Sequence, residues 1–255
     1  ARTTLSLAQA LYEKHKVLTY PRTDARALPE DYIDTVQATL KELSGTAFGE
    51  FSKQILNSGW VKPNKRIFDN SKISDHFAII PTLQMPKHLN DAEAKIYDLV
   101  VRRFLAVFYP PAEYMQTTRI TVVEENHFRT DGRILVNPGW LAIYGRSAQG
   151  ESENLPAITP NEIVNTVEIE SRPNQTRPPA RFTEATLLSA MEGAGKLVED
   201  GDLREAMSEK GLGTPATRAS VIEGLLFEDY LHRNQRELVP TPKAFSLLFA
   251  LRHFG

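Results

Sequence analysis

The sequence has no cysteine, which excludes a disulfide scaffold, a zinc site built on thiolates and a cysteine nucleophile. It has no apolar run near the roughly 20 residues that a helix needs to span a bilayer. No signal peptide opens the chain. From these absences we expect a cytoplasmic protein that is not attached to a membrane.

An excess of charge of either sign is also missing. The 30 lysine and arginine residues stand against 32 aspartate and glutamate residues, so the formal net charge is -2. Binding to a polyanion would therefore need local clusters of basic side chains.

The 255 residues, 41% of them hydrophobic, are enough to bury a sizeable core and are expected to form two or three domains.

The first region, residues 1–115, has mainly the period of α-helices. A helical pattern begins almost at Ala1 without an initiator methionine, which indicates a piece of a longer protein. Pro29 is expected to begin one helix, and Asp91 a long amphipathic one. The core face of that long helix is predicted to comprise Ile96, Leu99, Val100 and Phe104.

The second region, residues 116–175, changes to the alternation typical of antiparallel strands. We predict a turn at Asp131–Gly132 and a further strand over residues 161–173. Prolines then break regular structure, and the same stretch is expected to bring together Arg172, Arg177 and Arg181.

The third region, residues 176–255, is predicted to hold a helix capped by Thr183, a second helix, a short β-hairpin and a last helix. A helix pair followed by a hairpin is the outline of a winged-helix unit. The fold class predicted from the three regions is multidomain α+β. It combines a helical domain, an antiparallel β domain and a helical, winged-helix-like domain.

Tyr20, Arg22 and Asp24 alternate in the stretch TYPRTDAR. Pro21 disfavours a helix, and in an extended segment the three side chains would share one face. A tyrosine nucleophile needs a neighbour that favours its phenolate, and Arg22 could do this while holding a phosphate oxygen. Asp24 could orient Arg22 or a nearby histidine. A solvated surface loop would explain the same spacing.

A second stretch, SDHFAIIPT, places His76 at the edge of an apolar run that ends in proline. A lone histidine is more often structural than catalytic. If His76 faces Tyr20, it could bind a phosphate as imidazolium or relay a proton.

A third stretch, GLGTPATRAS, resembles a helix start, with Thr214 as N-cap and Pro215 as first helical residue. The free N–H groups of such a start form an anion site, to which Thr217 and Arg218 would add a hydroxyl and a guanidinium. An ordinary capped helix is the alternative. The buried face of this helix is predicted to be Ala219, Ile222 and Leu226.

Together the three stretches resemble the type IA DNA topoisomerases, most closely the bacterial topoisomerase III group. TYPRTDAR is similar to the signature around that family's nucleophile, and SDHFAIIPT to its histidine segment. RPPARFTEATLLSAME and GLGTPATRASVIE resemble its later helices. The matches follow the family's order and spread over nearly the whole chain.

The resemblance implies that Tyr20 attacks a DNA phosphodiester and becomes linked to the 5′-phosphate of a single-strand break. It implies that Arg22 stabilises the transition state, with Asp24 and His76 beside it. The implied partner is single-stranded DNA, bound by a monomer. The residues expected near this DNA are Thr214, Thr217, Arg218 and Arg181.

The implied fold is a ring. Residues 1–115 would be the gate domain with the tyrosine, residues 116–175 part of a β arch, and residues 176–255 part of a helical domain. Ala25 stands where the family often has serine, and Phe77 where topoisomerase III often has a second histidine.

The family's toprim domain, with its acidic Mg²⁺ ligands and a lysine, has no counterpart in this sequence. Mg²⁺ is therefore expected in the intact enzyme, with none bound by this chain. Two rival hypotheses remain: a winged-helix-type DNA-binding module that never catalyses, and a topoisomerase I or plasmid-encoded relative with the same chemistry.

Overall fold

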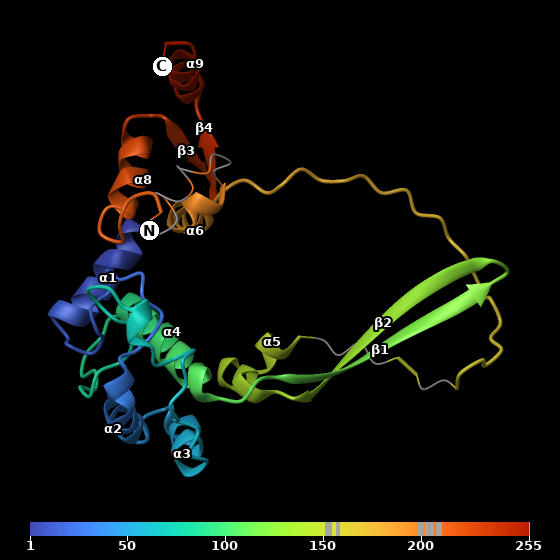
Figure 1. Cartoon of the computed structure of the whole chain (residues 1–255), viewed down its shortest axis with the longest axis horizontal. Helices are drawn as coiled ribbons and strands as arrows, with labels where there is room; N and C mark the ends of the chain where they lie inside the picture. Colours follow the sequence, from blue (N-terminus) through green and yellow to red (C-terminus); the bar gives the residue numbers. More distant parts are fainter. Residues whose placement is uncertain are drawn as a thin grey trace.

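A computed structural model describes residues 1–150, 155–156, 159–197, 201, 204, 207 and 211–254. In these parts the chain forms two helical lobes, a long hairpin and an extended segment, arranged as an open ring (Figure 1). We call residues 1–108 the N-terminal lobe, residues 159–182 the strap and residues 183–254 the C-terminal lobe. Among the described residues, no helix is long and apolar enough to cross a membrane.

The N-terminal lobe contains the main hydrophobic core. Its elements are α1 (Arg2–Glu13), η1 (Glu30–Tyr32), α2 (Ile33–Leu43), α3 (Gly49–Asn57), η2 (Asn70–Lys72) and α4 (Asp91–Phe108). The predicted helix starts at Pro29 and Asp91 are confirmed. At α4, the Asn90 side chain accepts from the Glu93 N–H at 2.9 Å, and the Glu93 carboxylate accepts from the Asn90 N–H at 3.0 Å. This reciprocal cap satisfies two backbone donors and fixes the start of the helix.

The buried face of α4 differs from the predicted one. Leu99 is 64% exposed, so its assignment to the core is wrong. α4 has more apolar residues than one helix face can contain. Only residues spaced by three or four positions share a face. The buried apolar residues with that spacing are Tyr97, Val101, Phe104, Leu105 and Phe108.

The predicted antiparallel strands are β1 (Glu113–Val123) and β2 (Asn126–Asn137), but their turn lies at residues 124–125. The predicted turn at Asp131–Gly132 is wrong, because these residues pair with Thr118 and Thr117 inside the ladder. A turn there would have carried Pro138 into the ladder, where proline cannot donate a hydrogen bond. After β2 the chain returns to α4 through η3 (Gly139–Tyr144) and α5 (Arg146–Gln149).

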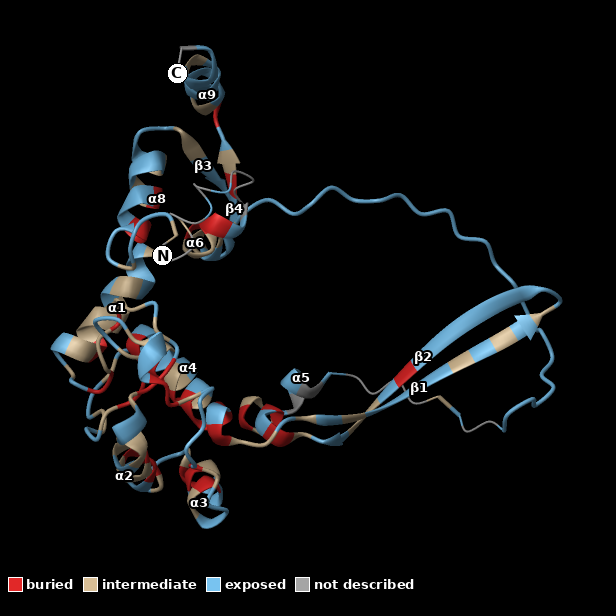
Figure 2. Ribbon diagram, in the orientation of Figure 1, coloured by how far each residue is buried: buried red, intermediate tan, exposed pale blue. Residues whose placement is uncertain are grey.

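The strap has no secondary structure, and all its residues are exposed (Figure 2). The strand predicted over residues 161–173 is therefore wrong. A strand is stabilised by pairing, and no described strand pairs with this segment. Ile163 and Val167 are left 96% and 95% exposed. Arg172, Arg177 and Arg181, which are predicted to come together, are all exposed on the strap, and Arg172 pairs with Glu170.

The C-terminal lobe has the predicted helix pair, hairpin and last helix. Its elements are α6 (Glu184–Glu192), η4 (Ala194–Leu197), α8 (Arg218–Phe227), β3 (Leu231–Asn234), β4 (Glu237–Pro240) and α9 (Pro242–Phe254). Thr183 caps α6 as predicted. Met191, Ile222 and Leu238 form a small core. Of the predicted α8 face, Ala219 and Ile222 are buried, and Leu226 packs against this small core.

Candidate active site

The first two sequence motifs lie side by side. The Thr19 N–H donates to the Ile80 carbonyl at 3.0 Å, and the Ile80 N–H donates to the Thr19 hydroxyl at 2.9 Å. The Ala78 N–H donates to the Ala27 carbonyl at 3.0 Å. Leu18, which is buried, anchors the same segment in the core. The structure thus joins the Tyr20 segment to the His76 segment by backbone hydrogen bonds.

Tyr20 and His76 are in direct contact, which is the condition under which the histidine could bind a phosphate or relay a proton. Their ring centroids are 4.3 Å apart, and the ring planes are inclined by 43°. Tyr12 of α1 packs edge-on against the Tyr20 ring, with centroids 5.3 Å apart. The Thr23 hydroxyl donates to the His76 carbonyl at 2.8 Å. The phenol therefore has a defined position, half-buried in contact with an aromatic ring and an imidazole.

The chain bends at Pro21 and Arg22, so the predicted single face of Tyr20, Arg22 and Asp24 is wrong. A bend removes the period-two alternation on which that prediction depended. Arg22 instead turns towards α1, where its Nη2 donates to the Gln9 side-chain carbonyl at 3.2 Å. Its Nε is buried and has no hydrogen-bond acceptor among the residues that the structure describes.

Asp24 reaches the other lobe. Its carboxylate accepts from Arg218 Nη1 at 2.8 Å, so it orients neither Arg22 nor His76. The Arg218 side chain is only 6% exposed, and it also donates to the carbonyls of Leu212 at 3.2 Å and Gly213 at 3.1 Å. Asp24 and Arg218 are 194 positions apart, so no local pattern could have revealed this pair.

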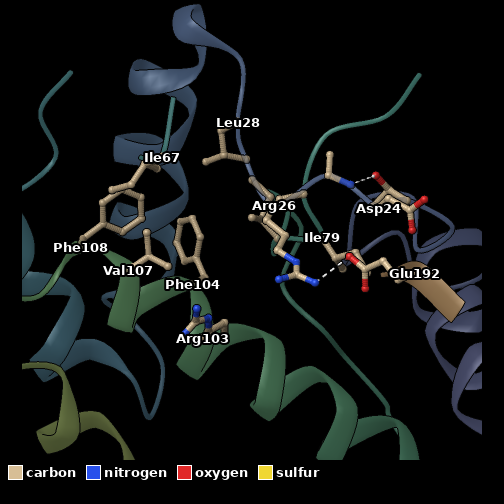
Figure 3. Close-up of a pocket in the computed structure, with 14 residues that line it drawn as sticks. Asp24, Arg26, Leu28, Ile67, Ile79, Arg103, Phe104, Val107, Phe108 and Glu192 are labelled. Atoms are coloured by element: carbon tan, nitrogen blue, oxygen red, sulfur yellow. Dashed lines mark hydrogen bonds and ion pairs between the residues drawn. The ribbon is translucent and has the colours of Figure 1, made fainter. Parts of the chain in front are cut away.

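A second ion pair crosses the same interface, and sequence reasoning missed it. The Arg26 guanidinium donates to the Glu192 carboxylate at 2.7 Å. Figure 3 shows this pair at one side of a cavity of about 390 Å³, with Phe104 and Phe108 of α4 on the other side. The cavity lies directly behind the loop that carries Asp24 and Arg26. Charged pairs and a partly apolar hollow thus make up this junction between the lobes.

The third motif folds differently from the prediction. α8 begins at Arg218, because residues 215–217 form a turn in which the Thr214 carbonyl accepts from the N–H groups of Thr217 and Arg218. The Thr217 hydroxyl accepts from the Thr214 N–H at 2.9 Å. The assigned start of α8 thus lies three residues after the predicted Pro215, although the Thr214 carbonyl accepts the i to i+4 hydrogen bond that is typical of a cap residue. Thr214 and Thr217 are exposed at this turn.

Gly211 of the same motif has a structural role. It adopts φ +63°, and a Cβ there would collide with the carbonyl oxygens of Met191 and Glu192 at the end of α6. The Leu212 N–H also donates to the Met191 carbonyl at 2.7 Å. Gly211 thus allows the loop before α8, residues 211–217, to pack on α6. This packing places Arg218 opposite Asp24.

The remaining predicted residue, Arg181, is exposed at the end of the strap. In the part of the chain that the structure describes, no group of three or more histidine, aspartate and glutamate side chains is placed to hold a metal ion. The described residues thus do not form a Mg²⁺ site.

Comparison with known proteins gives a consistent family. The model of the family described as DNA topoisomerase matches residues 1–255. The chain is similar to DNA topoisomerase 3 of Bacillus cereus, with 39% identity, and to DNA topoisomerase 3 of Bacillus subtilis (strain 168), with 36% identity. Each match covers 97% of this chain and 36% of the relative, so the chain spans about a third of the length of these relatives.

A solved structure, full-length topoisomerase I from Thermotoga maritima, matches in fold with a TM-score of 0.59. The match covers 98% of this chain and 38% of that chain, at 20% sequence identity. At this sequence identity the match shows a likeness of fold alone. On the evidence of the family model and the DNA topoisomerase 3 relatives, the chain belongs to the DNA topoisomerase family, in its type IA branch.

Proposed function

We propose that the chain is part of a type IA DNA topoisomerase that cuts and rejoins one DNA strand through a 5′-phosphotyrosine intermediate at Tyr20. The observation that carries this proposal is the position of Tyr20. Its ring is in contact with both Tyr12 and His76, and Arg22 lies on the same short segment. A nucleophile next to a group that can carry a proton is the arrangement that phosphoryl transfer requires.

In the cleavage step the Tyr20 hydroxyl oxygen forms a bond to phosphorus, and the bond from phosphorus to the 3′-oxygen breaks. The tyrosine loses its proton and the 3′-oxygen gains one, so the two strand ends are a phosphotyrosine and a 3′-hydroxyl. Rejoining reverses both changes. His76 is the group in this chain that can hold or move the proton, and Arg22 can stabilise the charge that develops on the phosphate.

We also propose that the chain is a fragment of a larger enzyme. Residues 1–115 would be the gate domain, residues 116–175 part of the β arch and residues 176–255 part of the helical DNA-binding domain of a monomeric enzyme. Single-stranded DNA would pass near Thr214, Thr217 and Arg181, and near Arg218, whose buried guanidinium is already paired with Asp24 and would not bind a phosphate. Mg²⁺ would be held by a separate toprim domain.

The test uses the full-length protein that contains this chain, incubated with a single-stranded oligonucleotide and stopped with denaturant. Tyr20→Phe removes only the hydroxyl, so we expect no covalent adduct and an unchanged affinity for the oligonucleotide. Tyr12→Phe, which changes the neighbouring ring in the same way, is the matched control and should keep the adduct.

Adducts at the parental level in Tyr20→Phe would remove Tyr20 from the reaction. Binding without any adduct in the parent protein would favour the rival hypothesis of a DNA-binding module that does not catalyse.

A further inference from the structure

Arg22 is bound by a neutral acceptor and not by a carboxylate, as is Arg119, which donates to the Pro156 carbonyl. Arg26, Arg218 and Arg233 each donate to a carboxylate, at 2.7 to 2.9 Å. Arg22 instead donates to a neutral acceptor, the side-chain carbonyl of Gln9 in α1. The hydrogen bond therefore orients the guanidinium without cancelling its positive charge.

We infer that Gln9 is a positioning residue for Arg22, which fixes the guanidinium while leaving its full charge for a DNA phosphate. The inference rests on the proposed function, because it assumes that Arg22 stabilises a phosphate in the reaction. A carboxylate at position 9 would hold the guanidinium at least as firmly, but it would form an ion pair that competes with the phosphate. A neutral amide avoids this competition.

The surroundings of the pair support this role. Gln9 is half-buried on α1, next to the helix's buried contact with the core through Leu11. The two side chains line a cavity of about 610 Å³ between α1 and α8, together with Ser6 and Ser220. Among the described residues Gln9 is the one hydrogen-bond acceptor of Arg22, so Nη donors remain that a phosphate oxygen could use. The guanidinium thus lies beside a space large enough for a phosphate group.

The orientation of the amide follows from chemistry. An arginine side chain has only donors, so the oxygen of Gln9 and not its nitrogen must face Arg22. The Gln9 NH₂ group then points away from the guanidinium and cannot repel it. Replacing this oxygen should leave Arg22 charged but free to rotate.

The experiment measures single-turnover cleavage, rejoining and oligonucleotide affinity in the full-length protein. Gln9→Met keeps the length of the side chain but removes the acceptor, and we expect cleavage and rejoining to slow about fivefold to tenfold with little change in affinity. Gln9→Glu keeps an acceptor but adds a charge, and it should slow the reaction as well. Thr3→Ala, an exposed change on the same helix, is the control and should behave as the parent.

A double-mutant cycle separates positioning from a general effect on the fold. In an Arg22→Ala background, Gln9→Met should cause no further loss, because the residue through which it acts is gone. A full additional loss in that background would overturn the inference. Parental rates in Gln9→Met, or in Gln9→Glu, would overturn it too. If Tyr20→Phe abolishes adducts while the Gln9 variants keep parental rates, only this inference fails, whereas adducts in Tyr20→Phe would remove the proposed function itself.

Discussion

Arg22 offers two properties that a single substitution can separate, its charge and its planar shape. Lysine retains the charge but has one point-like ammonium in place of a flat group with several donors. If Arg22 binds a phosphate as proposed, its side chain has to reach Gln9 and that phosphate at once, which a planar fork can do and an ammonium cannot do in the same geometry.

For Arg22→Lys in the full-length protein we expect cleavage and rejoining to slow about tenfold to a hundredfold, a loss of roughly 1.5–3 kcal/mol. The measurement is the single-turnover rate with a labelled oligonucleotide. An unchanged rate would mean that the guanidinium makes no two-point contact in the transition state.

Arg218 is expected to act at the junction of the lobes more than on DNA. It is buried, paired with Asp24 and bonded to two backbone carbonyls. Arg218→Ala should therefore destabilise this chain by about 1–3 kcal/mol in urea unfolding. It should leave the salt dependence of oligonucleotide binding unchanged.

The matched control is Arg181→Ala on the exposed strap, which should leave stability unchanged. If Arg181 touches a phosphate, this variant lowers the salt slope by about one counterion. A weaker salt dependence of oligonucleotide affinity in Arg218→Ala, with unchanged stability, would contradict this and indicate that Arg218 binds a phosphate.

At the scale of the element, α4 provides a direct comparison of two leucines on one helix. Leu105 is fully buried and Leu99 is 64% exposed. Leu105→Ala should cost about 2–5 kcal/mol because it leaves a cavity in the core. Leu99→Ala should change stability by less than about 0.5 kcal/mol. Urea unfolding of the two variants checks this, and equal losses would contradict the face assigned to α4.

Asp69 stabilises the loop that backs the Tyr20 segment. Its carboxylate accepts from the Ser71 hydroxyl at 2.7 Å and pairs with Lys72 at 2.9 Å. Its N–H donates to the Leu28 carbonyl at 2.9 Å. The Ser71 hydrogen bond, followed by Lys72, lowers the pKa of Asp69 from 3.8 to about 2.

A lowered pKa means that the ionised form is favoured by folding, so its contribution is present above about pH 4. The contribution is lost as the pH falls towards 2. Asp69→Asn should therefore lower the melting temperature at pH 7. The difference from the parent should shrink between pH 4 and pH 2. A difference that stays constant over this range would mean that the ionised carboxylate adds no stability.

Local patterns predicted the elements well where a single residue type decides the geometry. Pro29, Asp91 and Thr183 mark helix starts that the structure confirms, because caps and proline act over one turn. The face of α4 and the turn at residues 124–125 could not be predicted, since both depend on what packs or pairs opposite. The same limit applies to the site. The sequence indicates that His76 could act only if it contacts Tyr20, and it does not predict that contact. The Asp24–Arg218 pair joins two lobes, and no local sequence pattern indicates how these lobes dock.

At the scale of the whole molecule, we expect residues 1–255 alone not to relax supercoiled plasmid DNA. Arg22 and His76 can serve the phosphate and one proton, but the described residues form no metal site to stabilise the remaining charge. A gel assay with this chain beside the full-length protein, with and without Mg²⁺, checks the expectation. Relaxation by the chain that disappears with Tyr20→Phe would show that these residues are sufficient.

The chain reaches the C-terminal lobe from the hairpin of β1 and β2 by way of the strap, whereas that lobe meets the N-terminal lobe through non-covalent contacts (Figure 1). Partly exposed ion pairs such as Arg26–Glu192 contribute only about 0–1 kcal/mol each, too little to hold two separate proteins together. A covalent tether changes this, because it keeps one lobe near the other at an effective concentration of the order of millimolar. The junction can then be weak enough to open and still close again, independently of how dilute the protein is.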